Sequence, residues 1–136
     1  MPIDPTLPYD DGNLFARILT GEIPSTKVYE DEHALAFNDI HPQAPTHILV
    51  IPKGPYVSWD DFSQRASDVE IAGFVRAAGK VARHAGLVEE GYRLLANVGR
   101  NGGQEVPHLH VHILAGGPLG PMLARDRQSF SIAPTT

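Results

Sequence analysis

The chain has no cysteine, so it can form neither a disulfide nor a zinc site with thiolate ligands. It also has no apolar run of membrane-spanning length, and its first eight residues lack the basic start and apolar stretch of a secretion signal. We find no block of lysine or arginine, and the net charge is -5 with neutral histidines. These features argue against nucleic acid or an anionic membrane as the main partner. We therefore expect a soluble, cytoplasmic protein whose main partner is neither nucleic acid nor a membrane.

The 136 residues contain no internal repeat and fit one domain. We expect a flexible, Pro- and Asp-rich N-terminal segment over residues 1–12, a folded domain over 13–117 and a C-terminal tail over 118–136. Within the domain, apolar or alternating runs predict strands at 26–30, 34–38, 47–51, 92–96 and around 108–114.

Two segments have the apolar spacing of helices. The first has Leu14, Phe15, Ile18 and Leu19 on one face and stops before Gly21. The second starts at residues 67–70 with a capping box and carries an apolar stripe that ends at Gly86. The order of elements favours hairpins, so we predict an α+β fold: an antiparallel sheet of about five strands with two helices. The exposed edges of such a sheet favour dimerisation.

The most informative motif is a set of three histidines at alternate positions, His108, His110 and His112. Since successive side chains of a strand point to opposite faces, the three imidazoles share one face, and the other face receives Leu109, Val111 and Ile113. An imidazole can act as a nucleophile, a general acid or base, or a metal ligand. In phosphoryl transfer, the central His110 would attack while His112 stabilises the phosphate oxygens or protonates the leaving group.

A metal site is the alternative interpretation. Histidines at i and i+2 of a strand can both ligate zinc, and His47 could supply a third nitrogen. No carboxylate or thiolate of matching spacing completes the set, so we favour phosphoryl transfer without metal or cofactor. The glycines of the loop 99–103 permit a nest of backbone N–H groups that binds an anion, next to Gln104. Asp39 would either accept hydrogen bonds from sugar hydroxyls or close an Asx-turn.

Three segments resemble the histidine triad (HIT) proteins, and specifically the Hint branch of purine nucleoside phosphoramidases. Residues 108–114 match the signature His-x-His-x-His-x-x with apolar x, and residues 37–53 and 91–106 resemble the family's central strand and the approach to its triad. The resemblance covers about residues 13–117. It implies a HIT-like fold, a homodimer with one continuous sheet, a purine nucleotide of the AMP or GMP type as substrate, and no metal.

The resemblance also implies hydrolysis or transfer at the α-phosphorus of a nucleoside phosphoramidate or related AMP conjugate through a nucleotidyl-histidine. His110 would be the nucleophile, held by the backbone carbonyl of His108, while His112 contacts the phosphate and His47 supports the cluster. Asp39 would bind the ribose. The remaining residues implied for nucleotide binding line the base pocket or surround the phosphate: Leu14, Phe15, Ile18, Phe37 and Ile40, then Asn97, Gly103, Gln104 and Glu105.

Three departures from the family pattern matter for function. Asn13 and Ala16 stand where many bacterial relatives hold zinc with two cysteines. Glu105 stands where typical eukaryotic Hint proteins have serine, so its carboxylate would repel the substrate or select an amine-bearing leaving group. The C-terminal tryptophan of those relatives is missing, since the only tryptophan is Trp59. These changes favour a second hypothesis, a purine-nucleotide-binding or interaction module with vestigial catalysis; a histidine-ligated metal hydrolase is the third.

Overall fold

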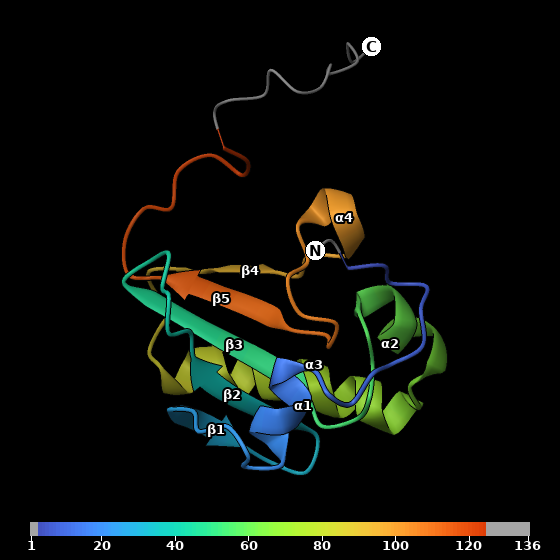
Figure 1. Cartoon of the computed structure of the whole chain (residues 1–136). Helices are drawn as coiled ribbons and strands as arrows, with labels where there is room; N and C mark the ends of the chain where they lie inside the picture. The colour runs from blue at the N-terminus through green and yellow to red at the C-terminus, as the bar shows by residue number, and fades with distance from the viewer. Residues whose placement is uncertain (1–2, 125–136) are drawn as a thin grey trace.

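The computed structural model describes residues 3–124, which form a five-stranded antiparallel sheet with helices against both faces (Figure 1). This confirms the predicted α+β class. Within residues 3–124, none of the helices is both long and apolar enough to cross a membrane. The strands, in their spatial order, are β1 (Lys27–Glu30), β2 (Ala34–Asn38), β3 (Thr46–Pro52), β5 (Val111–Ala115) and β4 (Arg93–Leu95).

One face of the sheet is covered by the long helix α3 (Asp68–His84). Its start is the predicted capping box: the Ser67 side chain accepts from the backbone N–H of Glu70, whose carboxylate accepts from the N–H of Ser67. The apolar stripe of α3, including Phe74 and Val81, packs on the inner side chains of β2, β3 and β5. This is the larger apolar core, and it holds the sheet rigid beneath the opposite face.

The opposite face carries the short helix α1 (Leu14–Leu19), whose N-cap is Asn13. Phe15 and Ile18 of α1 form a smaller cluster with apolar side chains of β2 and β3. The rings of Phe15 and Phe37 meet edge to face with their centroids 5.6 Å apart. Because α1 has only six residues, much of this face is left without a helix above it.

Two short helices were not predicted. Helix α2 (Trp59–Arg65) starts at the N-cap Ser58 and buries only Phe62 among its own residues, so the sequence shows no apolar stripe over this stretch. Helix α4 (Gly99–Gly102) is a single turn formed by the glycine-rich loop. It ends at Gly103, whose φ of 75° is a conformation that glycine adopts without strain.

The predicted anion nest is wrong for two N–H groups of this loop, those of Gly99 and Gly103, because they and the N–H of Gln104 are bonded within the turn. The N–H of Gly99 donates to Oε1 of Gln104 at 3.0 Å, and the N–H of Gln104 donates to the carbonyl of Gly99 at 3.0 Å. The N–H of Gly103 donates to the carbonyl of Arg100 at 3.2 Å. These groups stabilise the turn and are not free to bind an anion.

Only one of the three alternating histidines, His112, lies within β5. His108 and His110 lie in the segment just before it, which is anchored by a 2.8 Å bond from the N–H of Leu109 to the carbonyl of Tyr56. The predicted alternation nevertheless extends through this segment. The apolar residues that alternate with the histidines all join the core under α3: Leu109, Val111 and Ile113.

The segments at both ends of the described chain contact the domain. Figure 1 shows the N-terminal segment running from beside α4, past α2, to the start of α1. Near the other end, the guanidinium of Arg93 donates to the carbonyls of Gly120 and Pro121, at 2.9 and 3.2 Å. Residues 125–136 of the predicted tail lie outside the described residues, and the predicted boundaries at 12 and 117 stay predictions.

Candidate active site

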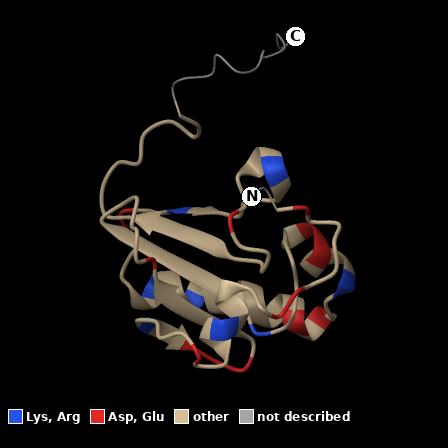
Figure 2. Cartoon of the chain, in the orientation of Figure 1, with Lys and Arg blue, Asp and Glu red and all other residues tan. Residues whose placement is uncertain are grey.

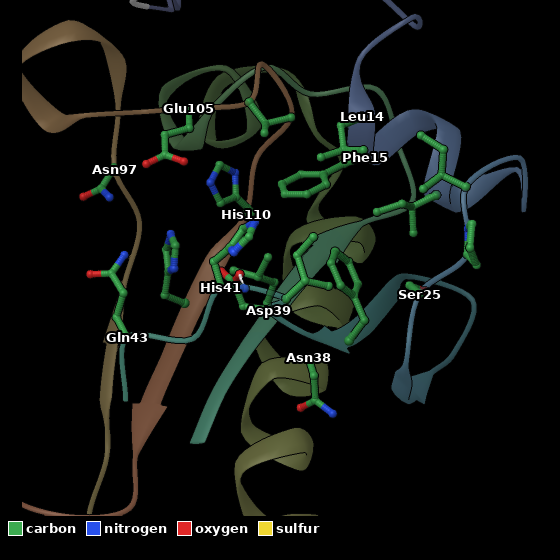
Figure 3. Close-up of a pocket in the computed structure, with 18 of the residues that line it drawn as sticks. Leu14, Phe15, Ser25, Asn38, Asp39, His41, Gln43, Asn97, Glu105 and His110 are labelled. Atoms are coloured by element: carbon green, nitrogen blue, oxygen red, sulfur yellow. Dashed lines mark hydrogen bonds between the residues drawn. The ribbon is translucent and has the colours of Figure 1, made fainter. Parts of the chain in front are cut away.

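A pocket of about 450 Å³ opens on the sheet face that α1 covers only in part (Figure 3). Eleven of the fourteen site residues suggested by the sequence line it: Leu14, Phe15, Ile18, Phe37, Asp39, Ile40, Asn97, Gly103, Glu105, His110 and His112. The three that do not line it are His47, His108 and Gln104, and each of these is buried. The histidine motif and the loops around it thus converge on one cavity.

The apolar part of the pocket combines buried and exposed side chains. Phe15, Ile18 and Phe37 are buried and also serve the small core on this face. Leu14 and Ile40 are 44% and 84% exposed, although both are large and apolar. Exposed apolar side chains that line a pocket are better explained by a ligand surface than by core packing.

His110 is oriented by a backbone carbonyl. Its Nδ1 lies 2.8 Å from the carbonyl oxygen of His108, which can only accept, so Nδ1 carries the proton and donates. The neutral ring therefore has its lone pair on Nε2. Burial lowers the pKa of His110, and the hydrogen bond to His108 and the charges of Glu105 and Asp39 oppose that shift. The ring lines the pocket and meets Phe15 edge to face with their centroids 4.9 Å apart.

A second chain of hydrogen bonds fixes His47 and His112. The backbone N–H of Gln43 donates to Nδ1 of His47 at 3.1 Å, so the neutral His47 is protonated on Nε2. That Nε2 lies 2.9 Å from Nδ1 of His112, which must accept. Neutral His112 is therefore protonated on Nε2. Burial, then the neighbouring His110 and His47, lower the pKa of His112 to about 4.

His108 lies behind the pocket, and both its ring nitrogens are bonded. Its Nε2 donates to the carbonyl of Pro52 at 2.9 Å, and its Nδ1 is 2.7 Å from the hydroxyl of Tyr9. The side chain is fully buried, and burial lowers its pKa to about 4. His108 thus stays neutral near pH 7 and contributes its backbone carbonyl to the orientation of His110.

Asp39 uses one carboxylate oxygen in its own loop. Oδ1 accepts from the backbone N–H of His41 at 2.8 Å, which is the geometry of the Asx-turn alternative. Oδ2 lies 3.5 Å from Nε2 of His47. Because Asp39 also lines the pocket, the turn leaves this second oxygen near the site while it holds the loop in place.

The ligand atoms of Asp39, His47 and His112 lie within 4.8 Å of one another, and this is the one potential metal cluster among residues 3–124. The hydrogen bonds do not suit a cation there. Nδ1 of His47 accepts from Gln43, so a metal would have to bind Nε2, which carries the proton. Moving that proton to Nδ1 would place it against the N–H of Gln43. This pattern favours a hydrogen-bonded chain over a metal site.

Comparison with known proteins places the chain in a family. The HIT domain matches residues 20–119 of the chain. The chain belongs to the HIT family. The purine nucleoside phosphoramidase of Escherichia coli K12 is 48% identical over 111 residues, which are 82% of this chain and 92% of that protein. A 13.2 kDa HIT-like protein of Azospirillum brasilense is 66% identical over 117 residues, which are 86% of this chain and 96% of that protein.

Solved structures give the same family. A histidine triad protein from Clostridium difficile has a TM-score of 0.74 and 45% identity, with 84% of this chain and 98% of that chain covered. A HIT family hydrolase from Legionella pneumophila has a TM-score of 0.73 and 48% identity, with 79% of this chain and 95% of that chain covered. The resemblance inferred from the sequence motifs is therefore confirmed.

Gln104 has a different place in this HIT domain from the one expected. Its side chain is buried: Oε1 accepts from the N–H of Gly99, and Nε2 donates to the carbonyls of Val57 and Val106, at 2.7 and 3.0 Å. Its amide thus links the start of α4 to the backbone of Val57, just before α2, and of Val106. Gln104 therefore shapes the pocket wall from behind and does not face a phosphate.

Several residues that line the HIT pocket were not predicted, among them Ser25, His41 and Gln43. They lie in loops rich in proline, where no periodic pattern indicates which way a side chain points. The repeated prolines around these positions, at 24, 42 and 45, were the available signal, since they mark rigid loops beside the strands.

The electrostatics of the HIT pocket are unusual for an anion site. Among the residues that the structure describes, its lining includes the carboxylates of Asp39 and Glu105 but no lysine or arginine. Figure 2 shows the lysines and arginines of the described chain spread over several elements. Figure 3 shows Glu105 and Asn97 on one side of His110, with Phe15 and Leu14 on the other. An anionic group in this pocket must rely on histidine and uncharged donors, such as the amide of Asn97.

Proposed function

We propose that this HIT protein is a hydrolase of purine nucleoside 5′-phosphoramidates or related AMP conjugates, with His110 as the nucleophile. The observation that carries the proposal is the hydrogen bond from Nδ1 of His110 to the carbonyl of His108. It leaves the lone pair of a neutral imidazole on the ring nitrogen that the pocket can use. The similarity to the phosphoramidase of Escherichia coli supports the reaction class.

The nucleotide would lie with its base against the apolar side of the pocket and its α-phosphate beside His110. Leu14 and Ile40 provide exposed apolar surface for the base. Asp39 would accept hydrogen bonds from the ribose hydroxyls through Oδ2, since Oδ1 already accepts from His41. Nε2–H of His112 would donate to a phosphate oxygen, because the Nδ1 of this ring is turned to His47.

In the first step, Nε2 of His110 would attack the α-phosphorus. The P–N bond breaks, and the nitrogen leaves as an amine after taking a proton from solvent. In the second step, water attacks the phosphorus, its proton passes to solvent, and the bond to His110 breaks. The products are the nucleoside monophosphate and the free amine. A lowered pKa favours the first step, because it keeps His110 unprotonated near neutral pH.

The charge of the pocket supports phosphoramidates over substrates with polyphosphate leaving groups. A nucleoside 5′-phosphoramidate carries one negative charge at its phosphorus, whereas a polyphosphate leaving group would bring further charges toward Glu105 and Asp39. No lysine or arginine among the described lining residues offsets them. An amine leaving group with a second, protonated nitrogen would instead be attracted by the carboxylate of Glu105.

The experiment is a substrate panel followed by mass spectrometry of the base-quenched enzyme. We expect turnover of an adenosine or guanosine phosphoramidate and a nucleoside monophosphate adduct on His110. Slow or absent turnover of a dinucleoside polyphosphate is expected in the same panel. AMP binding without turnover of any substrate would instead support the interaction module, and activity lost to a chelator would support the metal hydrolase.

We also propose that the protein forms a homodimer through the edge strand β4. The other edge, β1, is protected by the charged pair Lys27 and Glu30, whose side chains meet at 2.9 Å, and by an irregular register. On β4, by contrast, Leu94 is 47% exposed. Sedimentation should give a dimer that Leu94→Lys dissociates and Val28→Lys, on β1, does not; a monomeric native protein would contradict the proposal.

A further inference from the structure

The N-terminal segment reaches the back of the active site with one aromatic side chain, that of Tyr9. Before it, a turn places the carboxylate of Asp4 on the N–H of Thr6 at 2.9 Å, and the ring of Pro5 packs against Gly99, where a Cβ would come within 3.3 Å of it. After it, Asn13 donates from its side chain to the carbonyl of Asp10 at 2.7 Å. Tyr9 lies between these two anchored points. Its position is therefore fixed from both sides.

Tyr9 is hydrogen-bonded directly to the ring of His108. Its hydroxyl lies 2.7 Å from Nδ1 of His108, and the two rings meet edge to face with their centroids 5.6 Å apart. The direction of the hydrogen bond follows from the other side of the imidazole: Nε2 must donate to the carbonyl of Pro52, so Nδ1 must accept. The Tyr9 hydroxyl is thus the donor.

We infer that Tyr9 is a positioning residue for the reaction at His110, acting through His108. The inference rests on the proposed function. The hydroxyl of Tyr9 and the carbonyl of Pro52 hold the His108 ring at both nitrogens, and the carbonyl of the same residue holds Nδ1 of His110. Tyr9 belongs to neither the pocket lining nor the matched HIT residues 20–119. Tyr9 would therefore support the site from outside the matched residues.

Because His108 is buried, loss of its hydrogen bond to Tyr9 should disturb the ring. The His108 side chain has no exposed surface. Removing the Tyr9 hydroxyl would therefore leave Nδ1 of His108 as a buried acceptor without a donor. An unpaired buried acceptor is costly, and the ring would rotate or admit water to relieve the cost. Either response moves the residue whose carbonyl orients the nucleophile. The effect should appear in the chemical step more than in nucleotide affinity.

The test is Tyr9→Phe in the full chain, with Tyr29→Phe as the matched control. Tyr29 is also partly buried and donates its hydroxyl at 2.8 Å, but to Asp31 on the far edge of the sheet. We expect kcat for the nucleoside phosphoramidate to fall about three- to tenfold in Tyr9→Phe, with KM and AMP affinity within about twofold. Tyr29→Phe should leave both parameters at the native values.

Nitrogen-15 NMR of the imidazoles provides a readout that does not depend on turnover. In the native protein His108 should be neutral and protonated on Nε2, and Tyr9→Phe should move the Nδ1 resonance of His108 to higher frequency as its donor is lost. The resonances of His110 should shift as well, because its partner carbonyl belongs to His108. Tyr29→Phe should change none of them.

Two results would overturn the inference. One is a native His108 protonated on Nδ1, or resonances that Tyr9→Phe leaves unchanged, since the hydrogen bond would then not exist in solution. The other is a Tyr9→Phe protein with lower unfolding free energy but native kcat, which would make Tyr9 an anchor of the N-terminal segment alone. Absence of turnover in the native protein would instead contradict the proposed function, while the NMR result still decides the contact.

Discussion

The two faces of the segment that contains the histidines are held in place by different interactions. On one face Leu109, Val111 and Ile113 are almost completely buried under α3, and their positions follow from packing alone. On the other face the imidazoles are fixed by hydrogen bonds, two of them to the backbone carbonyls of Pro52 and His108. Apolar packing tolerates substitutions of similar volume, whereas a hydrogen-bonded imidazole has a defined proton position that no other side chain reproduces. Stability should therefore depend mainly on the first face and chemistry on the second.

The sharpest way to separate the two faces is to remove the nucleophile. His110→Ala should lower turnover of a nucleoside phosphoramidate by at least about a thousandfold, because no other pocket group has a free, unprotonated ring nitrogen in the same place. AMP affinity, measured by calorimetry, should change far less, since the base and ribose contacts remain. Substantial turnover in His110→Ala would remove His110 from the mechanism.

The histidine face should also determine how stability depends on pH. Burial lowers the pKa of His108 from 6.5 to about 4, so between these values the unfolded chain binds a proton that the folded chain does not. The stability that neutral His108 provides is complete above pH 6.5 and is lost as the pH falls toward 4. We expect the free energy of unfolding to drop by about 2 kcal/mol between pH 7.5 and 5 from this residue.

Urea denaturation at several pH values measures this effect. His108→Gln should be less stable at pH 7.5 but should show a flatter dependence on pH, because it has no imidazole to protonate at this position. His84→Gln, at the exposed C-terminal end of α3, should keep the native slope. An equal slope in native protein and His108→Gln would mean that His108 is not buried as a neutral ring.

The apolar face gives the opposite result. Val111→Ala should lower the free energy of unfolding by about 2 kcal/mol, because the removed methyl groups leave a cavity between the sheet and α3. Its kcat should stay within about twofold of the native value at a temperature where the variant is folded. A loss of kcat as large as that of His110→Ala would mean that the two faces are not separable.

The same distinction explains what could be read from the sequence. Alternation and the capping box predicted β5, α3 and the shared face of the histidines, since these patterns are local consequences of packing and of helix ends. The partners of the His108 ring could not be predicted: Tyr9 and Pro52 lie 99 and 56 residues from His108. Gln104 was assigned to the phosphate by motif, yet its amide is bonded entirely to backbone groups.

The smallest expected effect concerns Glu105, the exposed carboxylate beside His110. Its charge raises the pKa of His110 against the larger effect of burial. Glu105→Gln should therefore shift the acidic limb of the kcat/KM profile to lower pH, by only a few tenths of a unit because solvent screens the pair. The variant should also lose part of the preference for amine leaving groups that carry a second positive charge. Glu89→Gln, exposed and outside the pocket lining, is the matched control.

Salt separates this electrostatic effect from a change of shape. Both consequences of Glu105→Gln should shrink as ionic strength rises, since screening weakens interactions between exposed charges. The loss caused by His110→Ala should not depend on salt, because it removes a reacting atom. If the preference for cationic leaving groups survives in Glu105→Gln and in high salt, this carboxylate does not select the leaving group.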